Sequence, residues 1–139
     1  MIKDDCIFCK IANGNIPSYC LYEDNYFKVV LDIEPSSKGH GLIIPKSHAD
    51  NLFMLDEETA SRALIIAKKV SPAIMEVLGC DGMNLLQNNG EAAGQTINHF
   101  HIHLIPRYKN DSVGIKWNKN SLSKEWAEKF VSDIKENIK

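Results

Sequence analysis

The five histidines of the chain lie in two short segments, and their spacing is the feature best able to support chemistry. They are His40 and His48, followed by His99, His101 and His103. Side chains alternate between the two faces of a β-strand, so the last three histidines are expected to share one face. The apolar residues between them would then fill the core. Varied polar residues would be sufficient to make a sheet face soluble, so solubility alone does not account for three imidazoles in a row.

Two chemistries use such a row of imidazoles. One is a metal site, because a His-x-His pair on a strand offers two ligands to zinc. The other is nucleophilic catalysis, in which one imidazole attacks while its neighbours orient it and neutralise developing charge. The loop before the histidines carries small, amide and hydroxyl groups suited to phosphate oxygens, namely Asn88, Gly90, Gly94, Gln95 and Thr96. Its only acid is Glu91, which disfavours carboxylate-assisted metal hydrolysis.

Cys6 and Cys9 form a C-x-x-C pair near the start of the chain. The pair does not follow a strand of a βαβ unit, so a thioredoxin-like redox role is disfavoured. Two cysteines at this spacing and two histidines elsewhere can make a tetrahedral zinc site. The contrary interpretation is two buried thiols without metal. Cys20 and Cys80 are isolated and are expected to be small buried apolar residues.

Composition excludes several broad classes of protein. The 139 residues fit one domain, with 44% apolar and 24% charged residues and a net charge of −2. This charge gives no general attraction to nucleic acid or to an anionic membrane, so any phosphate must be bound by local groups. No apolar run approaches a membrane span, and the first residues lack a signal peptide's apolar stretch. We therefore expect a cytoplasmic protein.

Apolar periodicity and turn residues predict the elements that must position these side chains. Residues 16–31 alternate apolar and polar positions around a turn at 23–25 and indicate a hairpin. Residues 41–45, 83–87 and 96–106 are predicted as strands. Helical spacing begins after Asp56, passes Pro72, which should kink the helix, and ends at Gly79. A final amphipathic helix follows Ser123. These elements predict an α+β domain with a mostly antiparallel sheet.

At this point a family resemblance becomes specific. Residues 94–105, with the pattern His-φ-His-φ-His-φ-φ, resemble the signature of the histidine triad (HIT) family. Residues 6–11, 31–35 and 39–48 resemble its N-terminal blocks, in the expected order. The likeness covers about residues 5–107 and is strongest to the Hint-like branch, in its bacterial, zinc-containing form. It implies a single HIT domain over 1–139 with a tail from 108 to 139, a five-stranded sheet and two main helices.

The resemblance implies nucleotidyl transfer or hydrolysis through a covalent nucleotidyl-histidine. His101 would attack the α-phosphate through Nε2, because its Nδ1 donates to the backbone carbonyl of His99. His103 would contact the phosphate oxygens, and His40 would belong to the catalytic group. A neutral imidazole is a competent nucleophile near neutral pH. The expected substrate is a purine nucleotide conjugate of the AMP or GMP type, such as a phosphoramidate.

The resemblance also implies roles for binding residues. Asp32 would hold the ribose hydroxyls, while Phe8, Ile11 and Ile33 would wall the base, although each could simply be a core residue. The further phosphate or leaving-group contacts would be Asn88, Gln95 and Thr96. His48 and His99 would complete the zinc site with Cys6 and Cys9, with no catalytic metal. A homodimer with one continuous sheet is implied, and Trp117 would either reach the partner or anchor the tail.

Three other functions compete with this prediction. A metallohydrolase would place His99, His101 and His103 on one catalytic metal. A dinucleoside polyphosphate hydrolase would use the same attack with a nucleotide as the leaving group. A non-enzymatic nucleotide-binding module would bind without turnover. The sequence does not identify the leaving group.

Overall fold

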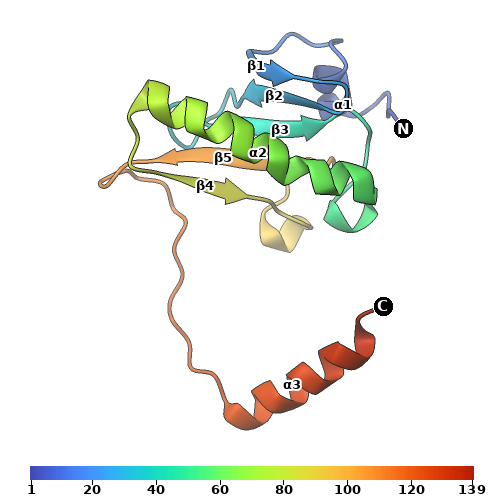
Figure 1. Ribbon diagram of the computed structural model, residues 1–139, viewed down its shortest axis with the longest axis vertical. Coiled ribbons are helices and arrows are strands. Elements are labelled where there is room, and N and C mark those ends of the chain that lie inside the picture. Colours follow the sequence, from blue (N-terminus) through green and yellow to red (C-terminus); the bar gives the residue numbers. More distant parts are fainter.

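A five-stranded antiparallel sheet backed by one long helix forms the body of the molecule. The computed structural model describes residues 1–139. Its strands are β1 (Cys20–Glu23), β2 (Phe27–Leu31), β3 (Gly41–Pro45), β4 (Gly82–Leu86) and β5 (Ile102–Arg107), in the sheet order β1-β2-β3-β5-β4. The long helix α2 (Glu57–Leu78) crosses one face of this sheet (Figure 1). The predicted α+β class and antiparallel sheet are therefore confirmed.

Helix α2 begins and ends at the residues that the sequence marks. The Asp56 side chain accepts a hydrogen bond from the Thr59 amide at 2.8 Å and caps the first turn. Gly79 ends the helix in the left-handed region at φ 63°, a conformation that glycine adopts without steric cost. The helix runs unbroken through Pro72. No helix of the structure has the length and apolar character that crossing a bilayer requires.

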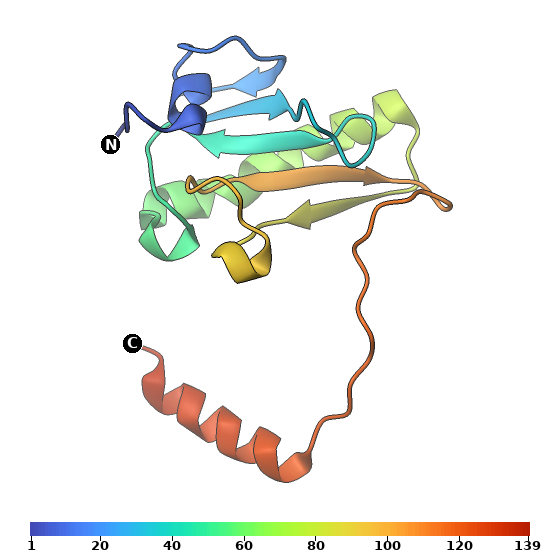
Figure 2. The same cartoon turned by 180° about the vertical axis from the view of Figure 1, so that it is seen from behind.

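The two faces of the sheet carry two separate apolar clusters. Val29 and Ile43 pack with the inner side of α2, whereas Val30, Leu42 and Ile44 pack on the opposite face against helix α1 (Ile7–Ala12). This division follows from the alternation of side chains along β2 and β3. Figure 2, seen from behind, shows α1 on the face away from α2. That face is where the histidine segment comes to lie.

The predicted strand over residues 96–106 is wrong in its first half, because β5 begins only at Ile102. The His99 amide bonds the Ile97 carbonyl at 2.9 Å, and the Phe100 amide bonds the Ala49 carbonyl at 2.7 Å. These bonds lie outside the sheet ladder, so residues before 102 bend away from strand geometry. Alternation nevertheless holds, because Phe100, Ile102 and Leu104 all point into the core under α2 while the His99 and His101 rings pack against Phe8 on the other side.

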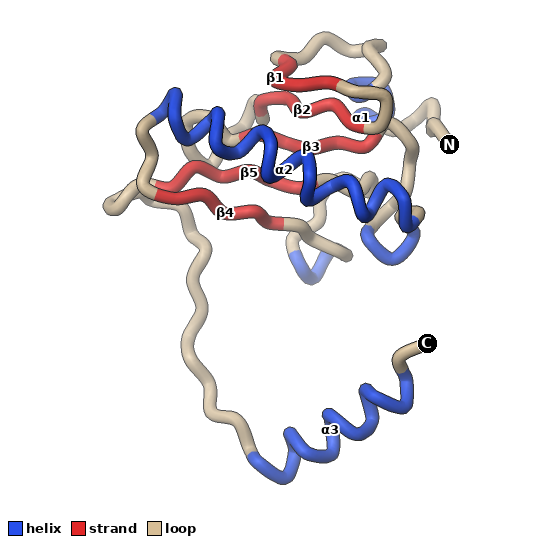
Figure 3. Tube along the Cα trace, viewed as in Figure 1, coloured by secondary structure: helices blue, strands red, loops and turns tan.

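Helix α3 (Lys124–Asn137) stands apart from the body, at the end of an extended segment (Figures 1 and 3). Ser123 caps its first turn, because Ser123 Oγ accepts from the Trp126 amide at 3.3 Å. None of its residues is buried. The final amphipathic helix is therefore confirmed as a helix, but its apolar side does not pack on the body.

Replacing Leu104 with alanine tests the position of the core. Leu104 is fully buried between the sheet and α2, so Leu104→Ala should lower the free energy of unfolding by about 2–5 kcal/mol. The matched substitution Leu64→Ala, on the exposed side of α2, should change it by less than about 0.5 kcal/mol. Urea unfolding measures both. Equal losses in the two variants would contradict this placement of the core.

Candidate functional site

The bend before β5 sends His99 and His101 to different places. The His99 ring lies fully buried beside the cysteine pair, and both Cys6 Sγ and Cys9 Sγ lie 3.4 Å from its Nδ1. The His101 ring instead packs edge-on against Phe8, at a centroid distance of 4.9 Å. One short segment therefore serves two neighbouring sites.

A hydrogen bond to the backbone two residues earlier fixes the ring of His101. Its Nδ1 lies 2.7 Å from the His99 carbonyl oxygen, which can only accept, so Nδ1 carries the proton and donates. In the neutral ring Nε2 is then the free lone pair. Burial lowers the pKa of His101 below its usual value, although the bond to the carbonyl opposes this shift. The ring is therefore neutral at pH 7, as a nucleophile requires.

His103 and His40 face each other beside His101. His103 Nδ1 lies 2.8 Å from His40 Nε2, and the His101 and His103 ring centroids are 4.9 Å apart. Burial, together with the nearby rings of His101 and His40, lowers the pKa of His103 to about 4. The pKa of His40 is also lowered, again mainly by burial. At neutral pH these side chains form a cluster of uncharged imidazoles.

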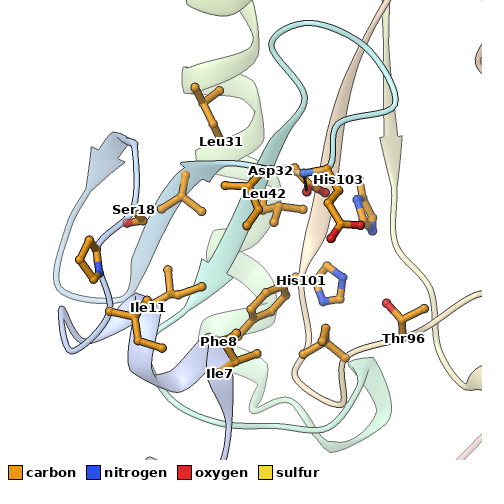
Figure 4. Close-up of a pocket in the computed structure, with 16 residues that line it drawn as sticks. Ile7, Phe8, Ile11, Ser18, Leu31, Asp32, Leu42, Thr96, His101 and His103 are labelled. Carbon is orange, nitrogen blue, oxygen red and sulfur yellow. Dashed lines mark hydrogen bonds between the residues drawn. The ribbon is translucent and has the colours of Figure 1, made fainter.

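A cavity of about 480 Å³ opens in front of His101 and His103. Figure 4 shows the two rings at one end, with Phe8 beside His101 and Ile11 further along the wall. Five of the seven substrate-binding residues expected from the sequence line this cavity: Phe8, Ile11, Asp32, Ile33 and Thr96. Its size and mixed lining suit a small, partly apolar ligand.

Asp32 lies at the junction between the apolar wall and the histidines. Its amide donates to the His40 carbonyl at 2.9 Å, which fixes the end of β2 against the start of β3. One carboxylate oxygen accepts from the Glu34 amide at 2.9 Å, and the other lies 3.7 Å from His40 Nε2. The side chain is thus partly buried and still offers acceptor capacity to the cavity.

The other two expected substrate-binding residues, Asn88 and Gln95, do not line the cavity. Gln95 is buried, and its side-chain nitrogen donates to the Asp50 and Ile97 carbonyls at 2.6 and 3.0 Å. Its side-chain oxygen accepts from the Gly90 amide at 2.8 Å, so the whole amide group is used to hold the loop. Asn88 Nδ2 lies 3.5 Å from the Gly94 carbonyl in the same loop. In this structure both side chains shape the loop that carries Thr96.

The short helix α1 was missed from the sequence, and it brings the cysteines to the histidines. Cys6 Sγ accepts from the Cys9 amide at 3.4 Å and caps a helix only six residues long. The Asn13 side chain then ties its end to the Lys46 carbonyl at 3.2 Å. The signal was present in the sequence, since a C-x-x-C pair places both sulfurs on one side of a helical turn. Ile7, Ile16 and Leu42 of the cavity wall were also not predicted.

Cys6, Cys9, His48 and His99 form a group whose ligand atoms all lie within 4.8 Å of one another. His48 Nδ1 lies 3.4 Å from Cys9 Sγ and 3.2 Å from His99 Nδ1. Tetrahedral zinc with ordinary bond lengths separates such ligand atoms by roughly 3.3–3.8 Å. The arrangement therefore fits a possible zinc site.

The outer nitrogens of both histidines support the same interpretation. His48 Nε2 lies 2.6 Å from a carboxylate oxygen of Asp50, and His99 Nε2 lies 2.9 Å from the Pro45 carbonyl. Each acceptor holds a proton on Nε2 and leaves Nδ1 free to coordinate a metal. Sequence reasoning did not identify the supporting roles of Asp50 and Pro45.

The metal site with all three triad histidines is not supported by this arrangement. His99 belongs to the cysteine group, and His103 belongs to a second group with Asp32 and His40. His101 is in neither group. The ring atoms thus do not converge on one ion.

Comparison with known proteins agrees with this geometry. Residues 13–110 match the HIT domain family. An adenosine 5'-monophosphoramidase of Schizosaccharomyces pombe is 40% identical over 96% of the chain and 98% of that protein. A HIT family protein from Bacillus anthracis, solved by crystallography, is 44% identical, with a TM-score of 0.90 over 98% of this chain and 99% of that one.

A second solved structure is also similar to this chain. It is a zinc-bound histidine triad family protein from Mycobacterium smegmatis, 36% identical, with a TM-score of 0.75 over 84% of each chain. Since the family match extends over most of the sequence, the chain belongs to the HIT family.

Proposed function

We propose that the protein is a nucleotide hydrolase or transferase that cleaves purine nucleotide conjugates at the α-phosphate through a nucleotidyl-His101 intermediate. The observation that carries this proposal is the 2.7 Å hydrogen bond from His101 Nδ1 to the His99 carbonyl. It fixes the tautomer in which Nε2 is a free lone pair beside the cavity. The related adenosine 5'-monophosphoramidase of Schizosaccharomyces pombe supports a phosphoramidate as substrate.

The reaction then has two balanced steps. His101 Nε2 forms a bond to the α-phosphorus as the bond to the leaving group breaks, and the leaving group departs with the electron pair and takes up a proton from solvent. Water next attacks the nucleotidyl-histidine and gives a proton to solvent, the phosphorus–nitrogen bond breaks with its electron pair returning to Nε2, and the nucleoside monophosphate is released. In this proposal His103, the other imidazole that lines the cavity, would donate a hydrogen bond to the phosphoryl oxygens.

The cavity walls fit a nucleoside on the apolar side of the histidines. Phe8, Ile11 and Ile33 offer a flat apolar slot of the kind that accommodates a purine without reading every edge. Asp32 lies between this slot and the histidines, where a carboxylate can accept from the two ribose hydroxyls. Thr96, on the far side of His101 in Figure 4, is placed for the phosphate or the leaving group.

We assign a structural zinc ion to Cys6, Cys9, His48 and His99. Zinc bound there would fix α1, and with it Phe8, against the sheet. The group uses no atom that the proposed reaction needs, because His99 contributes only its ring to the metal and its carbonyl to His101. A cytoplasmic location and a homodimer remain predictions from the sequence; the unpaired edges of β1 and β4 give the dimer a physical motive.

Replacing the nucleophile tests the covalent step. His101→Asn should reduce kcat for an adenosine phosphoramidate by at least about 1,000-fold, because attack at phosphorus is lost. Nucleotide affinity, measured by calorimetry, should change little, since the cavity walls are intact. A variant that keeps more than a tenth of the wild-type kcat would exclude His101 as the nucleophile.

Trapping the intermediate separates an enzyme from a binding module. Rapid acid-free denaturation during turnover, followed by mass spectrometry, should find one nucleotidyl group on the peptide that contains His101. Comparing kcat/KM for a phosphoramidate, an acyl-adenylate and a dinucleoside polyphosphate on one preparation then identifies the leaving group. Preference for the dinucleoside polyphosphate would favour the alternative hydrolase, whereas binding without an adduct or turnover would favour the module.

Zinc content and stability test the metal assignment. Tag-free protein should contain about one zinc per chain, and Cys9→Ser should lose it and melt roughly 5 °C lower, because metal binding contributes to folding. The prediction that Cys20 is buried is wrong, because it lies exposed on the edge strand β1. The matched variant Cys20→Ser should therefore keep both zinc and stability. Zinc near zero in the wild-type protein would remove the assignment. Immediate loss of turnover on chelation, before any unfolding, would instead indicate a catalytic metal.

A further inference from the structure

The hydrogen bonds around His40 determine where its proton lies. The Ser36 backbone amide donates to His40 Nδ1 at 3.0 Å, and a backbone N–H can only donate. Nδ1 is therefore unprotonated. Because burial lowers the pKa of His40, the ring is neutral and its single proton sits on Nε2.

The proton on His40 Nε2 in turn fixes the state of His103. The nearest acceptor is His103 Nδ1 at 2.8 Å, whereas the Asp32 carboxylate oxygen lies 3.7 Å away, beyond hydrogen-bond range. His103 Nδ1 must then be an acceptor, and its own proton lies on Nε2. The chain of donors runs from the Ser36 amide through His40 to His103.

We propose that His40 is a positioning residue that selects the Nε2-protonated tautomer of His103 and so keeps this ring a donor toward the phosphoryl group. His101 and His103 are consequently held in opposite tautomers. The carbonyl of His99 makes Nδ1 of His101 a donor, whereas the ring of His40 makes Nδ1 of His103 an acceptor. One ring presents a lone pair to the cavity and its neighbour presents a proton. The catalytic consequence rests on the proposed function, but the tautomer does not.

Nitrogen-15 NMR of histidine-labelled protein at neutral pH tests the tautomer without substrate. Wild-type His103, assigned with a His103→Asn sample, should show a protonated Nε2 and an unprotonated Nδ1. His40→Gln can still donate, because its amide nitrogen falls near the position of Nε2, and should keep that pattern. His40→Leu removes the donor and should give a mixture of tautomers. A wild-type His103 protonated on Nδ1 would overturn the proposal.

Kinetics on the same variants test the consequence. His40→Leu should lower kcat for an adenosine phosphoramidate at least about 10-fold with KM within about twofold, because the donor is needed as charge develops. His40→Gln should recover most of this loss, and Lys38→Leu, at an exposed position of the same loop, should behave as wild type. Unchanged tautomer and kcat in His40→Leu would refute the positioning role. If no nucleotide is turned over by the wild type, the proposed function fails while the NMR result still decides the tautomer.

Discussion

The arrangement of the site depends on the three bonds made by His99. Its ring nitrogen Nδ1 faces the cysteines, Nε2 bonds the Pro45 carbonyl, and the backbone carbonyl accepts from His101. A fully buried residue held at three points cannot rotate its carbonyl without breaking other contacts. The orientation of His101 is therefore set by a residue that itself has no freedom, and this makes the attacking nitrogen preorganised for the reaction.

The other histidine rings are also fixed by hydrogen bonds. Each ring is fixed by its own hydrogen-bond partner. These partners are a carboxylate, a backbone carbonyl, a backbone amide or another imidazole. Burial keeps the rings around the cavity neutral, so their hydrogen bonds rather than their charges define their roles. A row of similar side chains can thus hold a metal group, a lone pair and a donor within one small region.

The sequence predicted the elements that depend on local signals. The cap at Asp56, the glycine at the end of α2 and the hairpin around residues 23–25 all lie where their residue types indicate. The family signature predicted which histidines gather at the cavity and which face the cysteines. Local patterns were sufficient here because capping, turn chemistry and apolar period all depend on neighbours in the chain.

Features that depend on distant contacts were not predictable in this way. Alternation extended the last strand back to residue 96, but the bond from Phe100 to Ala49 and the packing of the His99 ring against the cysteines bend that segment. Gln95 was predicted to contact phosphate, but its side-chain nitrogen donates to the backbone carbonyl of Asp50, 45 residues earlier. The amphipathic pattern of α3 correctly predicted a helix, yet none of its residues is buried, because a local pattern does not specify what its apolar side packs against. In each case the local sequence shows which side chains can make hydrogen bonds or pack. The residues that they contact are distant in the sequence, so the local pattern does not identify them.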